Sequence, residues 1–178
     1  MVITKDTKKL ACVLLALYAL CLFWVVILKC NMYPAVEGTR LTIGKLPLFE
    51  RMHFSLAKFA KSDIPDIVVN ILIFIPLGLL LPILKEKNPC IFTASVGILT
   101  TIIVEITQLI TAIGGFTYID IMNNSLGTFI GIMLYFEIRK ALNKKTIKIA
   151  MILASTLCFG ILVFATINTI NNIDMYFL

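Results

Sequence analysis

The sequence contains few charged residues. Asp, Glu, Lys and Arg make up 15% of its 178 residues, whereas about 25% is usual in soluble domains. Hydrophobic residues account for 60% of the chain, against roughly 45–50% in soluble proteins. This composition excludes a water-soluble globule and predicts an integral membrane protein.

Residue groups that bind metals, bind cofactors or form catalytic triads are also missing. The single histidine, His53, has no Ser or Cys constellation near it in the sequence, and the five cysteines include no C-x-x-C pair. No H-E-x-x-H motif and no nucleotide-binding glycine loop occurs. We therefore expect no metal, no cofactor and no disulfide framework.

The net charge of +6 does not indicate a nucleic-acid partner, because the Lys and Arg residues stand between apolar runs. In a membrane protein, basic residues in short loops mark the cytoplasmic side. They gather before the first apolar run, after the second and after the fourth: Lys5, Lys8, Lys9, Lys85, Lys87, Arg139, Lys140, Lys144, Lys145 and Lys148. The sequence therefore predicts a cytoplasmic N-terminus and an extracellular C-terminus.

Five apolar runs are long enough to cross ~30 Å of hydrocarbon. They predict an all-α, polytopic transmembrane helix bundle in which residues 1–178 form a single domain. The spans are expected near residues 10–28, 67–84, 91–113, 119–138 and 147–167, with an outer loop at 29–66. Within that loop, Met52, Leu56 and Phe59 have helical spacing. This spacing fits a short helix on the membrane surface and fits an ordinary loop helix equally well.

Several polar side chains fall inside these spans, although a charged group at the centre of a span costs about 2.5–3.5 kcal/mol. All of them lie toward the ends that the charge pattern places outside. We therefore expect them to converge in one outward-facing cluster, which would bind a ligand or join the helices by hydrogen bonds. Capping of the fourth span is an alternative role for its aspartate. The candidate residues are Asn70, Glu105, Gln108, Asp120 and Asn124.

One proline and three glycines accompany the polar residues. Pro76 lacks an N–H and is expected to bend the second span beside Asn70. Gly78 follows it, and Gly127 and Gly131 form a G-x-x-x-G pattern that permits close helix contact.

The run from Asn70 to Gly78, the run Glu105-Ile-Thr-Gln108 and the run from Asp120 to Gly127 together resemble the VanZ-like family. The resemblance covers about residues 10–140. It implies a bacterial plasma-membrane protein of four or five helices associated with lowered sensitivity to teicoplanin-type antibiotics, and it implies no known reaction. Many members carry an arginine and an acid at positions that here are Gly114 and Thr117. The obvious counter-ion for the buried acids is therefore missing.

Three functional hypotheses follow. The first is a protein that binds or shields a lipoglycopeptide antibiotic or a lipid-linked wall precursor among the membrane lipids. The second is an intramembrane enzyme with Glu105 as general acid or base, although no nucleophile or second deep acid accompanies it. The third is a small transporter, which the apolar inner halves of the spans disfavour. The sequence makes no prediction about the oligomeric state.

Overall fold

The computed structural model describes residues 5–32, 64–85, 87–111, 117–142 and 146–177. These residues form five helices and no strand, which confirms the predicted all-α bundle. The surface helix considered near Met52 lies outside the described residues. The helices are α1 (Lys5–Met32), α4 (Ile64–Leu84), α5 (Pro89–Thr111), α6 (Tyr118–Leu142) and α7 (Thr146–Phe177).

Among the described residues, four helices are long and apolar enough to cross a membrane. Their spanning segments are Lys5–Val25, Ile67–Leu84, Pro89–Ile110 and Ile147–Ile167. The fifth helix, α6, has 25 residues, a length of about 37 Å at ~1.5 Å per residue. It falls outside the group by composition and not by length, because it contains the aspartate, amide and glycine residues of the fourth predicted span.

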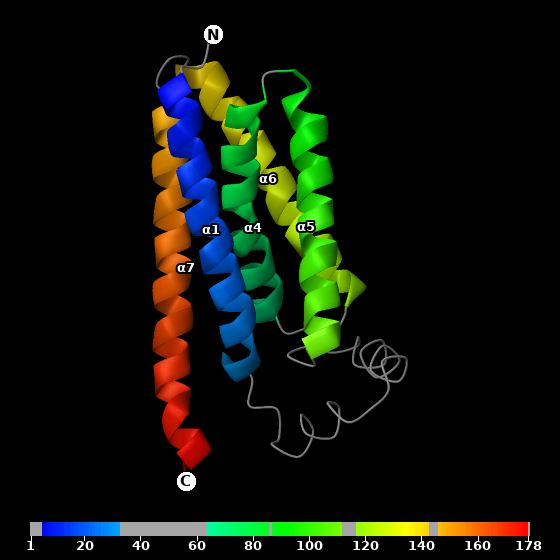
Figure 1. Ribbon diagram of the computed structural model, residues 1–178, viewed down its shortest axis with the longest axis vertical. Coiled ribbons are helices and arrows are strands. Elements are labelled where there is room, and N and C mark those ends of the chain that lie inside the picture. The colour runs from blue at the N-terminus through cyan, green and yellow to red at the C-terminus, as the bar shows by residue number, and fades with distance from the viewer. Residues whose placement is uncertain (1–4, 33–63, 86, 112–116, 143–145, 178) are drawn as a thin grey trace.

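Helix α4 occupies the centre of the bundle. It packs against all four other helices, with α1 and α7 on one side and α5 and α6 on the other (Figure 1). Within the molecule, 67% of its spanning segment is buried, against 22% in each of the other three apolar segments. Pro76 and Pro82 lie inside α4, which continues through both. The sequence of α4 is hydrophobic on all sides, and a helix of this kind is usually covered by its neighbours. Its central position agrees with that expectation.

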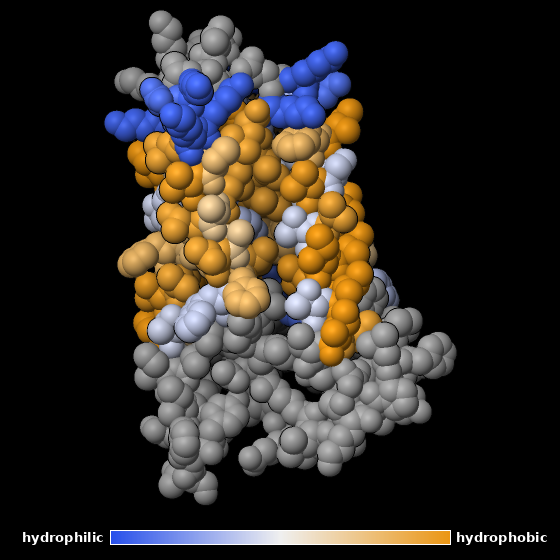
Figure 2. Space-filling model, viewed as in Figure 1, coloured by the Kyte–Doolittle hydropathy of each residue, from blue (hydrophilic) through white to orange (hydrophobic). Residues whose placement is uncertain are grey.

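The outer faces of the bundle are apolar. Large side chains such as Leu20, Phe23, Ile103, Phe129 and Phe159 are more than half exposed. In water such a surface would be unfavourable, but in a bilayer it contacts lipid. Figure 2 shows this apolar band below a hydrophilic end.

The hydrophilic end consists of basic residues from the start of α1, the α4–α5 connection and the α6–α7 region (Figure 2). The chain reverses direction between these helices, so the start of α4, the end of α5 and the start of α6 lie toward the opposite end of the bundle (Figure 1). The candidate polar residues belong to that opposite half. The described basic residues of these segments are Lys5, Lys8, Lys9, Lys85, Lys87, Arg139, Lys140 and Lys148.

Candidate functional site

All five candidate polar side chains are buried where α4, α5 and α6 meet. Each is at most 9% exposed, and Glu105 is the most deeply buried at 1%. Groups of this kind need hydrogen-bond partners in hydrocarbon. The contacts below show how the protein provides several of them. The residues are Asn70 from α4, Glu105 and Gln108 from α5, and Asp120 and Asn124 from α6.

A buried hydrogen bond joins the two helices that pack most extensively. The side-chain amide Nδ2 of Asn70 on α4 donates to the carboxylate Oδ1 of Asp120 on α6. The two residues are 50 positions apart in the sequence. A carboxylate accepts such a bond more strongly than a neutral carbonyl does, which helps to hold Asp120 inside the bundle.

The start of α6 is capped jointly by α6 and α5. The hydroxyl Oγ1 of Thr117 accepts a bond of 3.0 Å from the backbone N–H of Asp120. This places Thr117 at the N-cap and Asp120 at the third helical position. The backbone N–H of Thr117 in turn donates to Oε2 of Glu105 at 2.9 Å. In an ordinary capping box the acid at the third position would accept that N–H. Here Glu105 does so, and Asp120 is left to accept from Asn70.

This arrangement also provides favourable electrostatics for two carboxyl groups. Glu105 and Asp120 both lie at the N-terminus of α6, where the unpaired N–H groups and the helix dipole favour negative charge. The Thr117 backbone N–H and the Asn70 amide therefore donate hydrogen bonds to these two acids, as an arginine counter-ion would. Thr117, which carries no charge, contributes to the site as the cap of this helix.

A second polar link joins α5 to α6, deeper in the bundle. Nδ2 of Asn124 donates to Oγ1 of Thr101 at 2.8 Å, and Oγ1 of Thr128 donates to the backbone carbonyl of Asn124 at 3.2 Å. Gly97 on α5 makes room for Thr128, because a Cβ at Gly97 would lie 2.6 Å from the Thr128 methyl group. Among the described residues, Oδ1 of Asn124 is buried with no hydrogen-bond partner.

Three glycines set the distance between α4 and α6. A Cβ at Gly127 would lie 2.1 Å from the carbonyl oxygen of Ile71, and one at Gly131 would lie 2.3 Å from that of Ile75. From the other side, a Cβ at Gly78 would lie 2.2 Å from the carbonyl oxygen of Thr128. The two backbones are therefore in direct contact. This contact brings Asn70 within hydrogen-bond distance of Asp120.

The structure thus brings the polar residues from all three predicted spans into one region. Gln108 is buried one turn beyond Glu105 on α5, at 5% exposure. Three hydroxyl residues of the site, Thr101, Thr117 and Thr128, were not expected as hydrogen-bond partners from the sequence. Thr117 and Asp120 do have the spacing of a capping box, which is a recognisable signal. Among the described residues, no three His, Cys, Asp or Glu side chains lie together as metal ligands would.

Comparisons with known proteins identify related sequences. The model of the VanZ/LLP1 family matches residues 15–143. Protein VanZ of Enterococcus faecium is 28% identical over 150 residues, which are 84% of this chain and 88% of that protein. No solved structure matches. The region matched by the family model runs from α1 to the end of α6 and contains every residue of the polar cluster, whereas α7 lies beyond it.

Proposed function

This chain belongs to the VanZ/LLP1 family, and on that premise we propose that it lowers the sensitivity of a bacterial cell to teicoplanin-type lipoglycopeptide antibiotics. The family membership confirms the resemblance found in the sequence. The proposed mode of action is to bind or shield a lipidated molecule within the plasma membrane. For a lipoglycopeptide, this would reduce the density of drug at its cell-wall target.

The main support for the proposal is the burial of two acids, Glu105 and Asp120, together with three amide side chains inside a helix bundle. Neutral side chains are sufficient to join helices by hydrogen bonds. Burying a carboxyl group in hydrocarbon costs more free energy than burying an amide, so its presence favours a functional role. The two acids lie together at the N-terminus of α6, toward one end of the bundle. A site of this kind suits a ligand with many hydrogen-bond donors, such as the headgroup of a glycopeptide or of a wall precursor.

The proposal includes an orientation. The basic end of the bundle would face the cytoplasm, as the positive-inside rule requires. The polar cluster would then lie in the outer leaflet, where a drug arriving from outside could reach it. This orientation would also place the N-terminus inside and the C-terminus outside.

Thiol labelling in intact cells tests the orientation. The native Cys90 is exposed at the basic end of α5, and we expect it to resist a membrane-impermeant maleimide. A cysteine introduced by Tyr118→Cys, at the opposite end and 44% exposed in the native protein, should react, with the other cysteines replaced by serine in both variants. Labelling of Cys90 alone would reverse the orientation and place the cluster in the inner leaflet.

The role of the carboxyl group is tested by Glu105→Gln in a sensitive Gram-positive host. An amide oxygen can still accept the Thr117 N–H, so we expect the free energy of unfolding to change by less than about 1 kcal/mol. Protection against the lipidated glycopeptide should nevertheless be lost, as measured by inhibitory concentrations at matched membrane abundance. The matched control is Glu137→Gln on the exposed surface of α6, which should retain protection.

Two outcomes would contradict the proposal. If the unmodified chain protects equally against lipidated and non-lipidated glycopeptides, the ligand is not recognised as a lipidated molecule. If Glu105→Gln retains full protection, the charge at that position has no part in the function, and the cluster only joins helices.

A further inference from the structure

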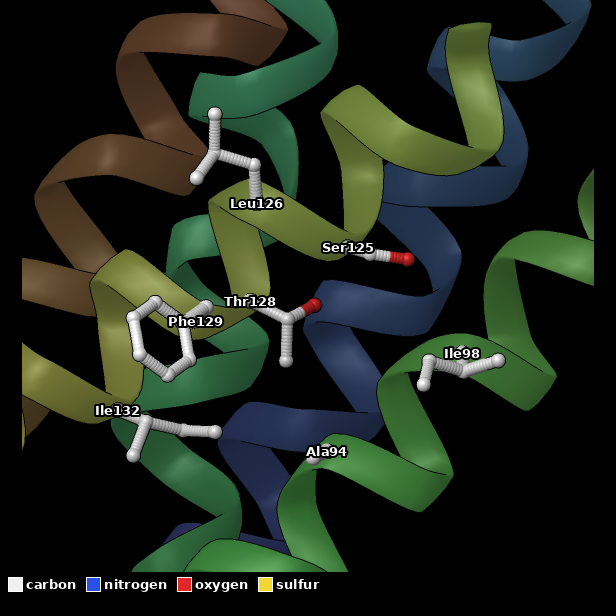
Figure 3. A pocket seen from close by; sticks show the side chains of 7 residues that line it. All are labelled: Ala94, Ile98, Ser125, Leu126, Thr128, Phe129 and Ile132. Atoms are coloured by element: carbon white, nitrogen blue, oxygen red, sulfur yellow. The ribbon is translucent and has the colours of Figure 1, made fainter. Parts of the chain in front are cut away.

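An apolar groove runs between α5 and α6 on their outer face. Its volume is about 310 Å³, and Figure 3 shows side chains from both helices around it. Only two of the lining residues carry a hydroxyl group. One of these, Thr128, uses its hydroxyl to donate to the carbonyl of Asn124. The groove therefore presents mainly hydrocarbon. Its lining residues are Ala94, Ile98, Ser125, Leu126, Thr128, Phe129 and Ile132.

The position of the groove determines what kind of molecule can fill it. Its residues lie in the middle of α5 and α6, within the apolar band of the bundle. At this depth the surroundings are hydrocarbon, so the occupant must be an apolar chain. The groove is also small, at about 310 Å³. That volume suits part of one acyl chain and is too small for two chains side by side.

The groove lies next to the polar residues Asn124 and Thr101. Thr128 lines the groove and is hydrogen-bonded to Asn124. Ile98 lies one turn from Thr101, the partner of the Asn124 side chain. An amphiphile with its headgroup at the cluster end of the bundle would therefore extend its chain toward the groove.

We propose that the α5–α6 groove binds the single acyl chain of a lipoglycopeptide, and so supplies the selectivity of the protein for acylated drugs. This inference rests on the proposed function and assigns it a second contact region. The headgroup is held near the polar cluster, while the chain lies against Ile98 and Phe129. The selectivity comes from shape and packing, because the surrounding lipid is as apolar as the groove.

A matched pair of variants tests the groove in cells. Ile98→Trp places an indole at a position that lines the groove, whereas Leu99→Trp places the same group at the next position, which is not among the lining residues. The two native side chains are similarly exposed, at 48% and 57%. We expect Ile98→Trp to lose the difference in protection between an acylated glycopeptide and the same glycopeptide without its chain. Leu99→Trp should keep that difference at equal abundance, and Ala94→Leu provides a second, smaller filling of the groove.

A binding experiment tests the same groove without any reference to resistance. The full chain in lipid nanodiscs is labelled with a decanoyl glycopeptide that carries a diazirine at the end of its chain. Labelled peptides are then identified by mass spectrometry. We expect labelling of the segments around Ile98 and Phe129. In Ile98→Trp it should fall by about fivefold or more, because the indole fills the volume in which the chain packs. In Leu99→Trp it should be unchanged.

The results separate the inference from the function on which it rests. If the unmodified chain does not alter susceptibility, the proposed function fails. If it protects the cell but the acylated glycopeptide labels no residue of the groove, the inference alone is overturned. It is also overturned if a diazirine-bearing phospholipid labels the groove equally well and excess acylated glycopeptide does not displace it, because the groove would then hold ordinary bilayer lipid.

Discussion

Two helix pairs in this bundle associate in different ways. Between α4 and α6 the backbones are in contact at glycines, and a buried amide–carboxylate bond joins the helices. Between α1 and α7 the contact is apolar, with Ala11, Ala150 and Ala154 fully buried. Among the side chains that the structure describes, every buried charged, amide or threonine residue belongs to α4, α5 or α6. Within the described side chains of α1 and α7, no such group is buried.

The difference follows from the solvent. In hydrocarbon, association of helices gains little from the hydrophobic effect, so close packing and hydrogen bonds must supply the free energy. Packing of small apolar side chains is enough to hold α1 against α7. The α4–α6 contact also fixes how the two helices are aligned along their axes, because Asn70 can reach Asp120 in only one alignment. A functional site needs that precision, and the family model covers this part of the chain but not α7.

The largest effect is expected from Gly127→Ala, which introduces a Cβ at 2.1 Å from the carbonyl oxygen of Ile71. A backbone atom has no room to withdraw, so α4 and α6 must separate. We expect a loss of ~3 kcal/mol or more in the free energy of unfolding. Reversible unfolding in mixed micelles measures it.

The control for that substitution lies on α7. Gly160 has nothing within 4 Å of the position its Cβ would take. Gly160→Ala should leave the protein equally stable or stabilise it by up to about 1 kcal/mol, because alanine favours helix. Equal destabilisation by both substitutions would mean that the α4–α6 contact is no closer than the rest of the bundle.

A smaller effect is expected from Thr101→Val. Valine has nearly the same shape as threonine, so the substitution removes only the hydroxyl that links α5 to α6. Thr101 is fully buried, and its hydroxyl accepts the bond from Asn124. The substitution leaves that amide donor without this partner. We expect a destabilisation of about 1–2 kcal/mol, measured in the same unfolding assay. A neutral result would show that the Asn124 bond adds nothing to stability.

The smallest effect is expected from Tyr18→Phe. This substitution also removes one buried hydroxyl, but from the apolar cluster around α1. Tyr18 is 3% exposed, and within the described part of the chain its hydroxyl has no hydrogen-bond partner. We expect unfolding to be unchanged or to become harder by up to about 1 kcal/mol, since an unpaired polar group is lost. Destabilisation comparable to that of Thr101→Val would indicate that the hydroxyl is paired in the membrane.

Several features could be predicted from the sequence because they depend on composition and spacing. Apolar runs of sufficient length identify the spans, and two of them, 67–84 and 147–167, coincide with the spanning segments of α4 and α7. The fourth span was also expected, and it forms α6. The helices extend further than the apolar runs, with α1 reaching Met32 and α7 reaching Phe177. A helix can continue beyond its apolar run, so hydropathy alone does not predict where the helix ends.

The amino-acid sequence is enough to predict a membrane helix bundle in which several polar side chains require partners, because a polar side chain is costly wherever it lies in hydrocarbon. These side chains are Asn70, Glu105, Gln108, Asp120 and Asn124. Which partners they have depends on how the helices pack. Asn70 donates to Asp120, and Glu105 accepts the N–H of Thr117, the residue just before α6. A hydrogen bond depends on positions within a few tenths of an ångström, and the glycine contacts between α4 and α6 set those positions only when the helices are assembled.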